Sequence, residues 1–324
     1  MIQNQKDCII QMNLFGKKKI PFLFVLDFEF TFGYVIPLAE IDQNQCLYFV
    51  PGSSNAPKPD KPLVFNLKPS PISFETYLLA FQKVQDELQK GNSFLTNLTF
   101  ETPLECDAGL RDIFLHSHAK YKLWMRDQFV VFSPETFVSI DKNVIYTHPM
   151  KGTIDARLPD AENLIRNSEK EKAEHYTIVD LLRNDLSKVA KKVEVSRLRY
   201  LEKISAKDKE LLQVSSEIRG ILPADWHSNI GDIFAKLLPA GSVTGAPKPQ
   251  TVQIIKSVEN HRRNFYTGVF GIFDGEKLDS AVMIRFINQK DNGLFYKSGG
   301  GITHLSDAKN EYEEMIQKIY VPIS

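Results

Sequence analysis

The sequence predicts an α+β fold in one large unit. Segments typical of strands and segments with helical spacing of apolar residues follow one another in mixed order, without the regular strand–helix alternation of a doubly wound sheet. At 324 residues the chain is long enough to bury a large core, and it contains no internal repeat and no low-complexity tract. We therefore expect a single large domain over residues 1–324.

The N-terminal region, residues 1–65, is predicted to consist of strands. Pro21–Phe30 is apolar and aromatic, Gln45–Val50 is a second short apolar run, and Pro51–Asp60 has the composition of a loop. Further strands are expected at Phe94–Phe100, Phe129–Phe132, Phe137–Ile140, Asn143–Thr147, Leu212–Ile218, Gly268–Phe273, Leu278–Ile287 and Leu294–Ser298.

Helices are predicted from apolar residues three or four positions apart. In Ser73–Gly91, the apolar residues Tyr77, Phe81, Val84 and Leu88 have this spacing, and Gly91 is a typical helix stop. The other expected helices are Leu110–Ala119, Glu162–Asp185, Ile230–Leu237, Pro247–Glu259 and Asp307–Ile319.

Composition excludes several classes of partner. Forty basic and forty acidic residues give no net charge, so no global field favours nucleic acid or an anionic membrane. No apolar run approaches the roughly 18–20 residues that span a bilayer, and Asp27 interrupts the run that follows Lys17–Lys19 and resembles a signal peptide. The three cysteines are scattered without metal-ligand spacing, which indicates reduced thiols in a cytoplasmic protein.

One lysine stands out because of its neighbours. Lys151 lies in the run Pro149-Met150-Lys151-Gly152-Thr153, directly after the strand-like Asn143–Thr147. A glycine at this point allows another chain or a ligand to approach closely. The run alone leaves two readings open, a solvated loop lysine and a catalytic one.

Acidic residues recur in three places. Glu135 follows Ser133-Pro134, where its simplest reading is an exposed turn residue. Glu171 and Glu174 share a helix face with apolar residues, and Glu311 and Glu314 lie together on the last predicted helix. Carboxylates beside apolar residues are costly to bury without a cation, so each pair is either a solvated stripe or a cation site.

Two glycine-rich segments indicate anion binding. The segment 239–248, which includes Ser242, carries two glycines and two hydroxyls before a predicted helix, although it lacks the ending of a P-loop. Gly299, Gly300 and Gly301 follow a predicted strand and allow backbone amides to meet a ligand, unless they form a flexible hinge. Arg285 offers a bidentate grip on a carboxylate. These groups suit a small dianionic substrate with Mg²⁺, whereas no His/Cys cluster supports zinc.

At this point the sequence resembles the chorismate-utilising enzymes, and among them component I of aminodeoxychorismate synthase (para-aminobenzoate synthase). The similarity covers residues 74–322. The matching motifs, in order, are Gly91…Asn97-Leu98-Thr99, Ser133-Pro134-Glu135, Pro149–Thr153, Ala173-Glu174…Ile178–Asp185, Gly241–Lys248, Ile284-Arg285, Gly299–Ile302 and Glu311–Glu314.

The resemblance implies a fold and a ligand set. The family fold is one large α+β domain, in which two antiparallel sheets pack together with helices outside and hold chorismate and Mg²⁺ in a cleft. By resemblance, Glu174 and Glu314 bind Mg²⁺, with Glu171 and Glu311 nearby. The remaining contacts with chorismate are assigned by resemblance to Arg285, Gly299, Gly300, Gly301, Thr153 and Ser242.

The resemblance also implies a reaction. Aminodeoxychorismate synthases carry lysine where anthranilate synthases carry alanine, so Lys151 favours the former. In the family mechanism this lysine attacks C2 of chorismate, Glu135 protonates the departing C4 hydroxyl, and ammonia then adds at C4.

The chain departs from the family at Leu95, where relatives have Gln or, in isochorismate formers, Lys. A family histidine is apparently replaced by Leu212, and a pocket tyrosine by Ile272.

The resemblance therefore implies amination of chorismate to 4-amino-4-deoxychorismate, a step toward para-aminobenzoate and folate. The chain has no Cys-His-Glu constellation of a glutaminase, so ammonia is expected from a separate glutamine amidotransferase subunit. Three rivals remain. Anthranilate synthase component I is disfavoured by Lys151, and isochorismate or salicylate synthase by Leu95. A catalytically dead regulatory subunit is disfavoured by the retained catalytic residues.

Overall fold

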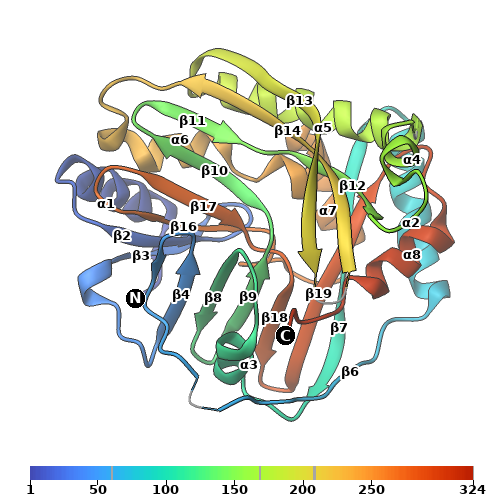
Figure 1. Cartoon of the computed structure of the whole chain (residues 1–324), viewed down its shortest axis with the longest axis horizontal. Coiled ribbons are helices and arrows are strands. Elements are labelled where there is room, and N and C mark those ends of the chain that lie inside the picture. The colour runs from blue at the N-terminus through green and yellow to red at the C-terminus, as the bar shows by residue number, and fades with distance from the viewer. Residues whose placement is uncertain (60, 168, 207–208, 324) are drawn as a thin grey trace.

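The chain folds into two packed β-sheets with helices on their outer faces (Figure 1). This computed structural model describes all residues except 60, 168, 207–208 and 324; the side chains of residues 151, 153, 169–170, 204–206, 209 and 211 also lie outside the described part. The α+β class and the two antiparallel sheets expected from the sequence are confirmed.

Sheet A contains ten of the described strands, and its neighbouring strands run antiparallel. Their order is β1 (Gln3–Asn4), β3 (Phe32–Pro37), β2 (Phe22–Leu26), β16 (Val269–Phe273), β17 (Leu278–Val282), β10 (Thr136–Asp141), β11 (Val144–Thr147), β14 (Lys209–Ile221) and β12 (Met150–Asp155), with β13 (Lys191–Ala206) also paired to β14.

Sheet B contains nine of the strands in the described part of the chain, again antiparallel. Their order is β15 (Gly245–Ala246), β7 (Leu95–Cys106), β19 (Gly293–Ile302), β18 (Phe286–Lys290), β9 (Phe129–Ser133), β8 (Tyr121–Met125), β4 (Cys46–Val50) and β5 (Ser53–Ser54), with β6 (Leu67–Pro69) paired to β7. In both sheets, strands from the first hundred residues or so pair with strands after residue 268.

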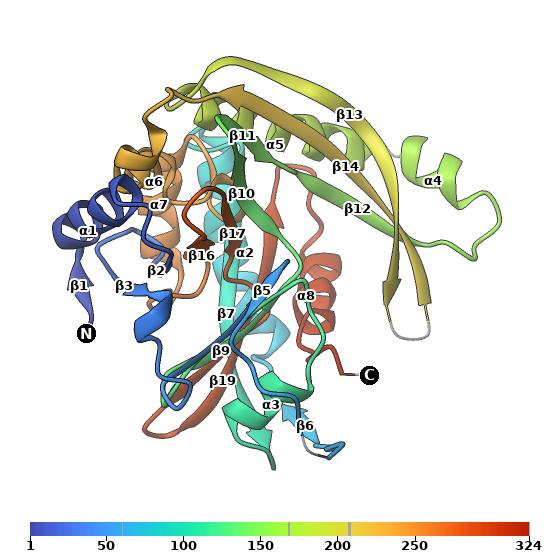
Figure 2. The same ribbon diagram turned by 60° about the vertical axis from the view of Figure 1, so that its left-hand side comes forward.

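Helices cover both sheets. The described helices are α1 (Gln5–Lys17), α2 (Phe74–Gln89), α3 (Leu110–His116), α4 (Ala161–Asn167), α5 (Glu169–Ser187), α6 (Ile230–Leu237), α7 (Lys248–Val258) and α8 (Ala308–Gln317). Short 3₁₀ turns lie at η1 (Leu38–Glu40), η2 (Trp226–Asn229) and η3 (Gly241–Val243). In Figure 2, α5 runs alongside β13 and β14, while α8 lies next to β19.

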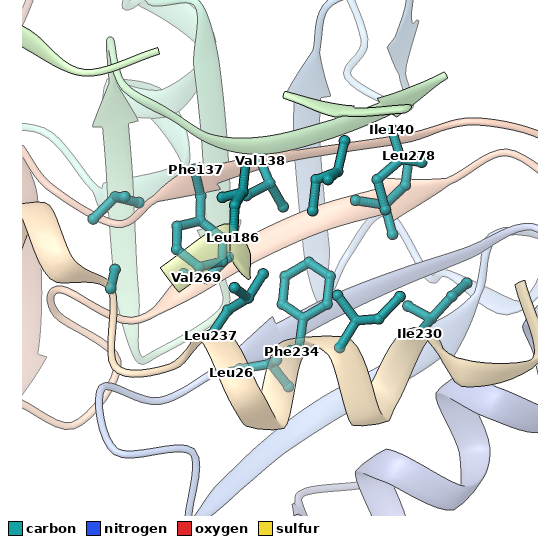
Figure 3. Packing of buried hydrophobic residues seen from close by; sticks show 14 of the residues in the cluster. Leu26, Phe137, Val138, Ile140, Leu186, Ile230, Phe234, Leu237, Val269 and Leu278 are labelled. Carbon is teal, nitrogen blue, oxygen red and sulfur yellow. The ribbon is translucent and has the colours of Figure 1, made fainter. Parts of the chain in front are cut away.

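Strand β2 is buried on both faces because helices cover one side of sheet A and sheet B covers the other. Phe22, Phe24 and Leu26 join the cluster under α6, whereas Leu23 and Val25 point into the core between the sheets. This two-residue alternation follows from strand geometry. Figure 3 shows the helix side, where Phe234 and Leu237 of α6 face residues of β10, β16 and β17. The apolar run after Lys17–Lys19 is therefore a core strand.

Several expectations about individual elements were wrong. The N-terminal region contains the helix α1 in addition to strands. In contrast, every described residue of the helix expected over Glu162–Asp185 is helical, in α4 and α5, with residue 168 outside the described part. Strands β8, β12 and β13 were not expected. The three glycines lie within β19 rather than after a strand.

The remaining composition-based expectations can be compared with the structure. Cys8 and Cys46 are buried free thiols and Cys106 is half-buried, so they pack as small apolar side chains. Burial raises the pKa of Cys8 to about 11, with the neighbouring Asp7 and Asp27 adding to the effect. Among the described residues, no helix is long and apolar enough to cross a membrane.

Candidate active site

A cavity of about 260 Å³ lies where the two sheets meet, and it gathers most of the segments singled out in the sequence. Sheet A contributes β12 and β14, sheet B contributes β7 and β19, and helices α5 and α8 contribute Ile178 and Glu314. Of the predicted site residues, those lining it are Glu135, Ser242, Arg285, Gly299, Gly300, Gly301 and Glu314.

The backbone of the lysine motif forms the start of β12. Lys151 pairs with Val214 and Thr153 with Gln213, and a register shift separates the two pairs at Gly152. The side chains of Lys151 and Thr153 lie outside the described part of the structure. Their neighbours Met150 and Gly152 line the cavity, so the motif lies at its wall. Gly152 has a φ of 78°, which favours glycine at this position.

Glu135 is held at the turn between β9 and β10. Its backbone N–H donates to Ser133 Oγ (3.1 Å), and Ser242 Oγ donates to Glu135 Oε1 (2.5 Å). Ser133 is fully buried at the end of β9, which fixes the turn. Glu135 is therefore a half-buried carboxylate facing the cavity rather than an exposed turn residue.

The acidic residues of α8 lie beside the glycine strand. Glu311 is 4% exposed and accepts a hydrogen bond from Ser306 Oγ (2.8 Å), while Glu314 Oε1 pairs with Lys318 Nζ (2.5 Å). A Cβ added at Gly300 would lie 3.3 Å from Glu311 Oε2 and 3.8 Å from Glu314 Oε1. The absence of a side chain at Gly300 thus lets both carboxylates approach the strand.

Two acidic residues of α5, Glu171 and Glu174, lie at different sites: one against β12 and one in a second cavity. Glu171 lies against β12, because a Cβ at Gly152 would be 3.0 Å from Glu171 Oε2. Glu174 lines a neighbouring cavity of about 750 Å³, beyond the strand pair of Leu95 and Ala246. Among the described residues, no three His, Cys, Asp or Glu side chains are close enough together to hold a metal ion. The four carboxylates nonetheless supply the hard oxygen donors that Mg²⁺ prefers.

Arg285 lies just before β18 with a φ of 54°. Its guanidinium carbon is 4.9 Å from the centre of the Tyr320 ring, and its buried Nε has no hydrogen-bond partner among the described residues. A buried donor without a partner is costly, so an anionic group in the cavity would stabilise it.

The glycine strand has one open edge at the cavity. The ladder between β18 and β19 ends at the pair Phe286–Lys297, and from Ser298 onward the described part of β19 pairs with β7 alone. Backbone amides of Gly299–Gly301 on that edge can meet a ligand directly.

The three departures from the family pattern lie in different environments. Leu95 is 3% exposed and lines the cavity, as expected. Leu212 and Ile272 are both buried, and neither is among the described residues that line this cavity. Gln213, the neighbour of Leu212 in β14, and Tyr266 do line it.

A buried ionic network behind the cavity was not anticipated. Arg263 and Glu259 are 2% and 1% exposed and form a bidentate pair, with Arg263 Nη2 to Glu259 Oε1 at 2.6 Å and Arg263 Nε to Glu259 Oε2 at 2.9 Å. Lys297, also 2% exposed, donates to Arg262 O (2.8 Å), and burial lowers its pKa to about 8 despite the neighbouring Glu101. The charged run Glu259…Arg263 between two apolar segments was the available signal, because buried charges require partners.

Comparison with known proteins identifies the family. The family model described as "chorismate binding enzyme" matches residues 36–324. An uncharacterized PabA-like protein of Pasteurella multocida (strain Pm70) is 53% identical over 319 residues, which cover 97% of this chain and 98% of that protein.

Two further relatives have named activities. Aminodeoxychorismate synthase component 1 of Escherichia coli (strain K12) is 32% identical over 267 residues, covering 77% of this chain and 57% of that protein. The crystal structure of anthranilate synthase component I from Streptococcus pneumoniae TIGR4 superposes with a TM-score of 0.66 at 26% identity, covering 79% of this chain and 58% of that one. This chain therefore spans little more than half the length of either synthase.

The fold, the cavity and these similarities define the class of protein. The chain belongs to the chorismate binding enzymes.

Proposed function

We propose that this protein aminates chorismate to 4-amino-4-deoxychorismate with ammonia from a separate glutamine amidotransferase subunit. The observation that carries the proposal is the convergence of Glu135, Arg285 and the glycine strand on one cavity whose wall includes the backbone of the lysine motif. We place the reaction in the cytoplasm, where three free cysteines stay reduced.

Recognition of chorismate rests on two groups of residues. Arg285 and the amides of Gly300 and Gly301 hold the enolpyruvyl carboxylate through charge-assisted and backbone hydrogen bonds. Glu174 and Glu314, from α5 and α8, would hold Mg²⁺, with Glu171 and Glu311 beside them. A bound Mg²⁺ would supply positive charge that neutralises the ring carboxylate of chorismate.

Covalent chemistry follows from Lys151 and Glu135. The Lys151 nitrogen forms a bond to C2, the ring double bond shifts, and the C4–O bond breaks as Glu135 gives its proton to the departing hydroxyl, which leaves as water. Ammonia then forms a bond to C4, the bond between C2 and Lys151 breaks, and Glu135 takes up the proton lost by the new ammonium group. The amino group and the intact enolpyruvyl side chain remain in the product.

The rival activities differ in what attacks the ring. A water-adding enzyme needs a base that activates water near C2, and the aliphatic Leu95 cannot accept a proton. The motif Pro149–Thr153 carries lysine where the anthranilate-forming pattern has alanine. Both features favour amination at C4 over the alternatives.

The test is product analysis by mass spectrometry. Purified protein is incubated with chorismate, Mg²⁺ and an ammonium salt, and 4-amino-4-deoxychorismate is the expected product. Anthranilate or isochorismate as the main product would overturn the proposal, as would recovery of unreacted chorismate.

A further inference from the structure

Arg263 uses every N–H donor of its guanidinium group. Besides its bidentate pair with Glu259, Nη1 donates to Val243 O (2.7 Å) and Thr267 Oγ1 (3.4 Å), and Nη2 donates to Asn97 O (2.7 Å). A buried arginine with all donors satisfied is rigid, because moving it breaks several hydrogen bonds at once.

Three of the groups that Arg263 contacts belong to the wall of the candidate active site. Asn97 on β7, Val243 in η3 and Thr267 before β16 all line the cavity of about 260 Å³. The Glu259 carboxylate makes further hydrogen bonds as well, since its Oε1 also accepts from Thr99 N (2.9 Å) and Thr99 Oγ1 (2.8 Å). The buried pair thus ties together strands and turns that are far apart in the chain.

One of these connections leads to Glu135. Val243 directly follows Ser242 in the turn η3, and Ser242 Oγ donates to Glu135 Oε1. By holding the Val243 carbonyl, Arg263 restrains the backbone of the turn from which the Ser242 side chain projects. That hydroxyl donates to Oε1 and so restrains the orientation of the Glu135 carboxylate.

We propose that Arg263 and Ser242 are positioning residues that hold Glu135 in place for proton transfer, acting through Val243. This inference rests on the proposed function, in which Glu135 is the acid. A general acid must lie within about 2.6–3.2 Å of the atom it protonates, and a displacement of 1 Å can cost about 100-fold in rate.

Lysine cannot replace Arg263 in this role. A lysine would keep a positive charge opposite Glu259, but its compact ammonium cannot reach Val243, Asn97 and both carboxylate oxygens together. Threonine, in contrast, can replace Ser242, because it keeps a hydroxyl on the same carbon. Arg263→Lys therefore keeps the positive charge but loses the hydrogen-bond geometry, whereas Ser242→Thr keeps the hydroxyl group.

The experiment measures kcat, the chorismate KM and the melting temperature for Ser242→Ala, Ser242→Thr and Arg263→Lys. Ser117→Ala is the control, because Ser117 is also buried and donates to a backbone carbonyl, Phe114 O, away from the cavity. We expect Ser242→Ala and Arg263→Lys to lower kcat by about 10- to 100-fold with KM within about twofold. Ser242→Thr should recover most of the rate, and the control should leave it unchanged.

A double-mutant cycle with Glu135→Gln distinguishes positioning from a general structural effect. If Ser242 acts through Glu135, Ser242→Ala causes no further loss of kcat in the Glu135→Gln background. Full activity of Ser242→Ala, or an equal loss in both backgrounds, would overturn the proposal.

Identifying the product that the wild type makes from chorismate shows whether the positioning role or the proposed function has failed. If the wild type releases a different product from chorismate, the proposed function fails, and the same cycle measured on that product decides the positioning role. If the wild type consumes no chorismate, both fail.

Discussion

Replacing either of two adjacent glycines of β19 with alanine is expected to affect different properties: stability at Gly299 and ligand binding at Gly300. Neither Gly299 nor Gly300 has a left-handed φ, so alanine is compatible with both backbones. At Gly299, a Cβ would lie 2.1 Å from Leu98 O and 2.7 Å from Thr99 Cα, both backbone atoms of the paired strand. At Gly300, its nearest neighbours are the ends of flexible side chains, beginning with Glu311 Oε2 at 3.3 Å.

The distances set the magnitudes. Gly299→Ala must push β7 and β19 apart, and overpacking of this kind costs about 3 kcal/mol, which lowers the melting temperature by about 4 °C in a chain of this size. Gly300→Ala displaces side-chain ends only, so its effect on stability stays within about 1 kcal/mol. Its methyl group lies between the α8 carboxylates and the strand, and we expect Mg²⁺ and chorismate to bind at least about tenfold more weakly.

Thermal unfolding followed by circular dichroism measures the first effect, and titration with Mg²⁺ and chorismate measures the second. The reasoning is refuted if Gly300→Ala binds both ligands as tightly as the wild type. It is also refuted if Gly299→Ala melts at the wild-type temperature, since the close strand approach would then carry no cost.

Three other substitutions test single roles. Lys151→Ala should lower aminodeoxychorismate formation at least about 100-fold while chorismate still binds, and near-normal turnover at saturating ammonia would remove its role as nucleophile. Glu174→Gln and Glu314→Gln should each shift the Mg²⁺ titration to higher concentration, because an amide is a poorer ligand for a hard cation; unchanged curves for both would make them ordinary solvated residues. With ammonia omitted, chromatography should detect little isochorismate from the wild type and more from Leu95→Lys, and abundant isochorismate from the wild type would contradict the idea that Leu95 keeps water away.

Elements with a strong local pattern were predicted best. The helix α6 begins and ends at the predicted residues, Ile230 and Leu237, because its apolar positions follow a helical period. The helix α1 was missed because its fully buried face contains only Cys8, Met12 and Gly16, a stripe too weakly apolar to stand out. Strand β13 was missed because Val193 and Val195 alternate with charged residues over a short stretch only, and the alternation is interrupted where the pairing with β14 shifts register at Arg197.

Local sequence patterns also explain which residues of the candidate active site could be predicted. Glu135, Arg285 and the glycine strand were recognised because each lies in a short motif that keeps its spacing. The role of Arg263 depends on backbone carbonyls of Asn97 and Val243, which no local pattern brings near it. Side chains whose function depends on distant backbone atoms become visible only when the tertiary structure is known.

The order in which the sheets are built has a consequence for synthesis on the ribosome. In sheet A, β2 pairs with β16, and in sheet B, β7 pairs with β19. Each of these early strands is therefore synthesised about 200 residues or more before its partner. At roughly 5–20 residues per second, β7 emerges at least ten seconds before β19 is available. During that interval its unpaired edge is open to pairing with other chains. In a nascent chain of this topology, the β7 edge that pairs with β19 therefore stays exposed until residue 302 has left the ribosome.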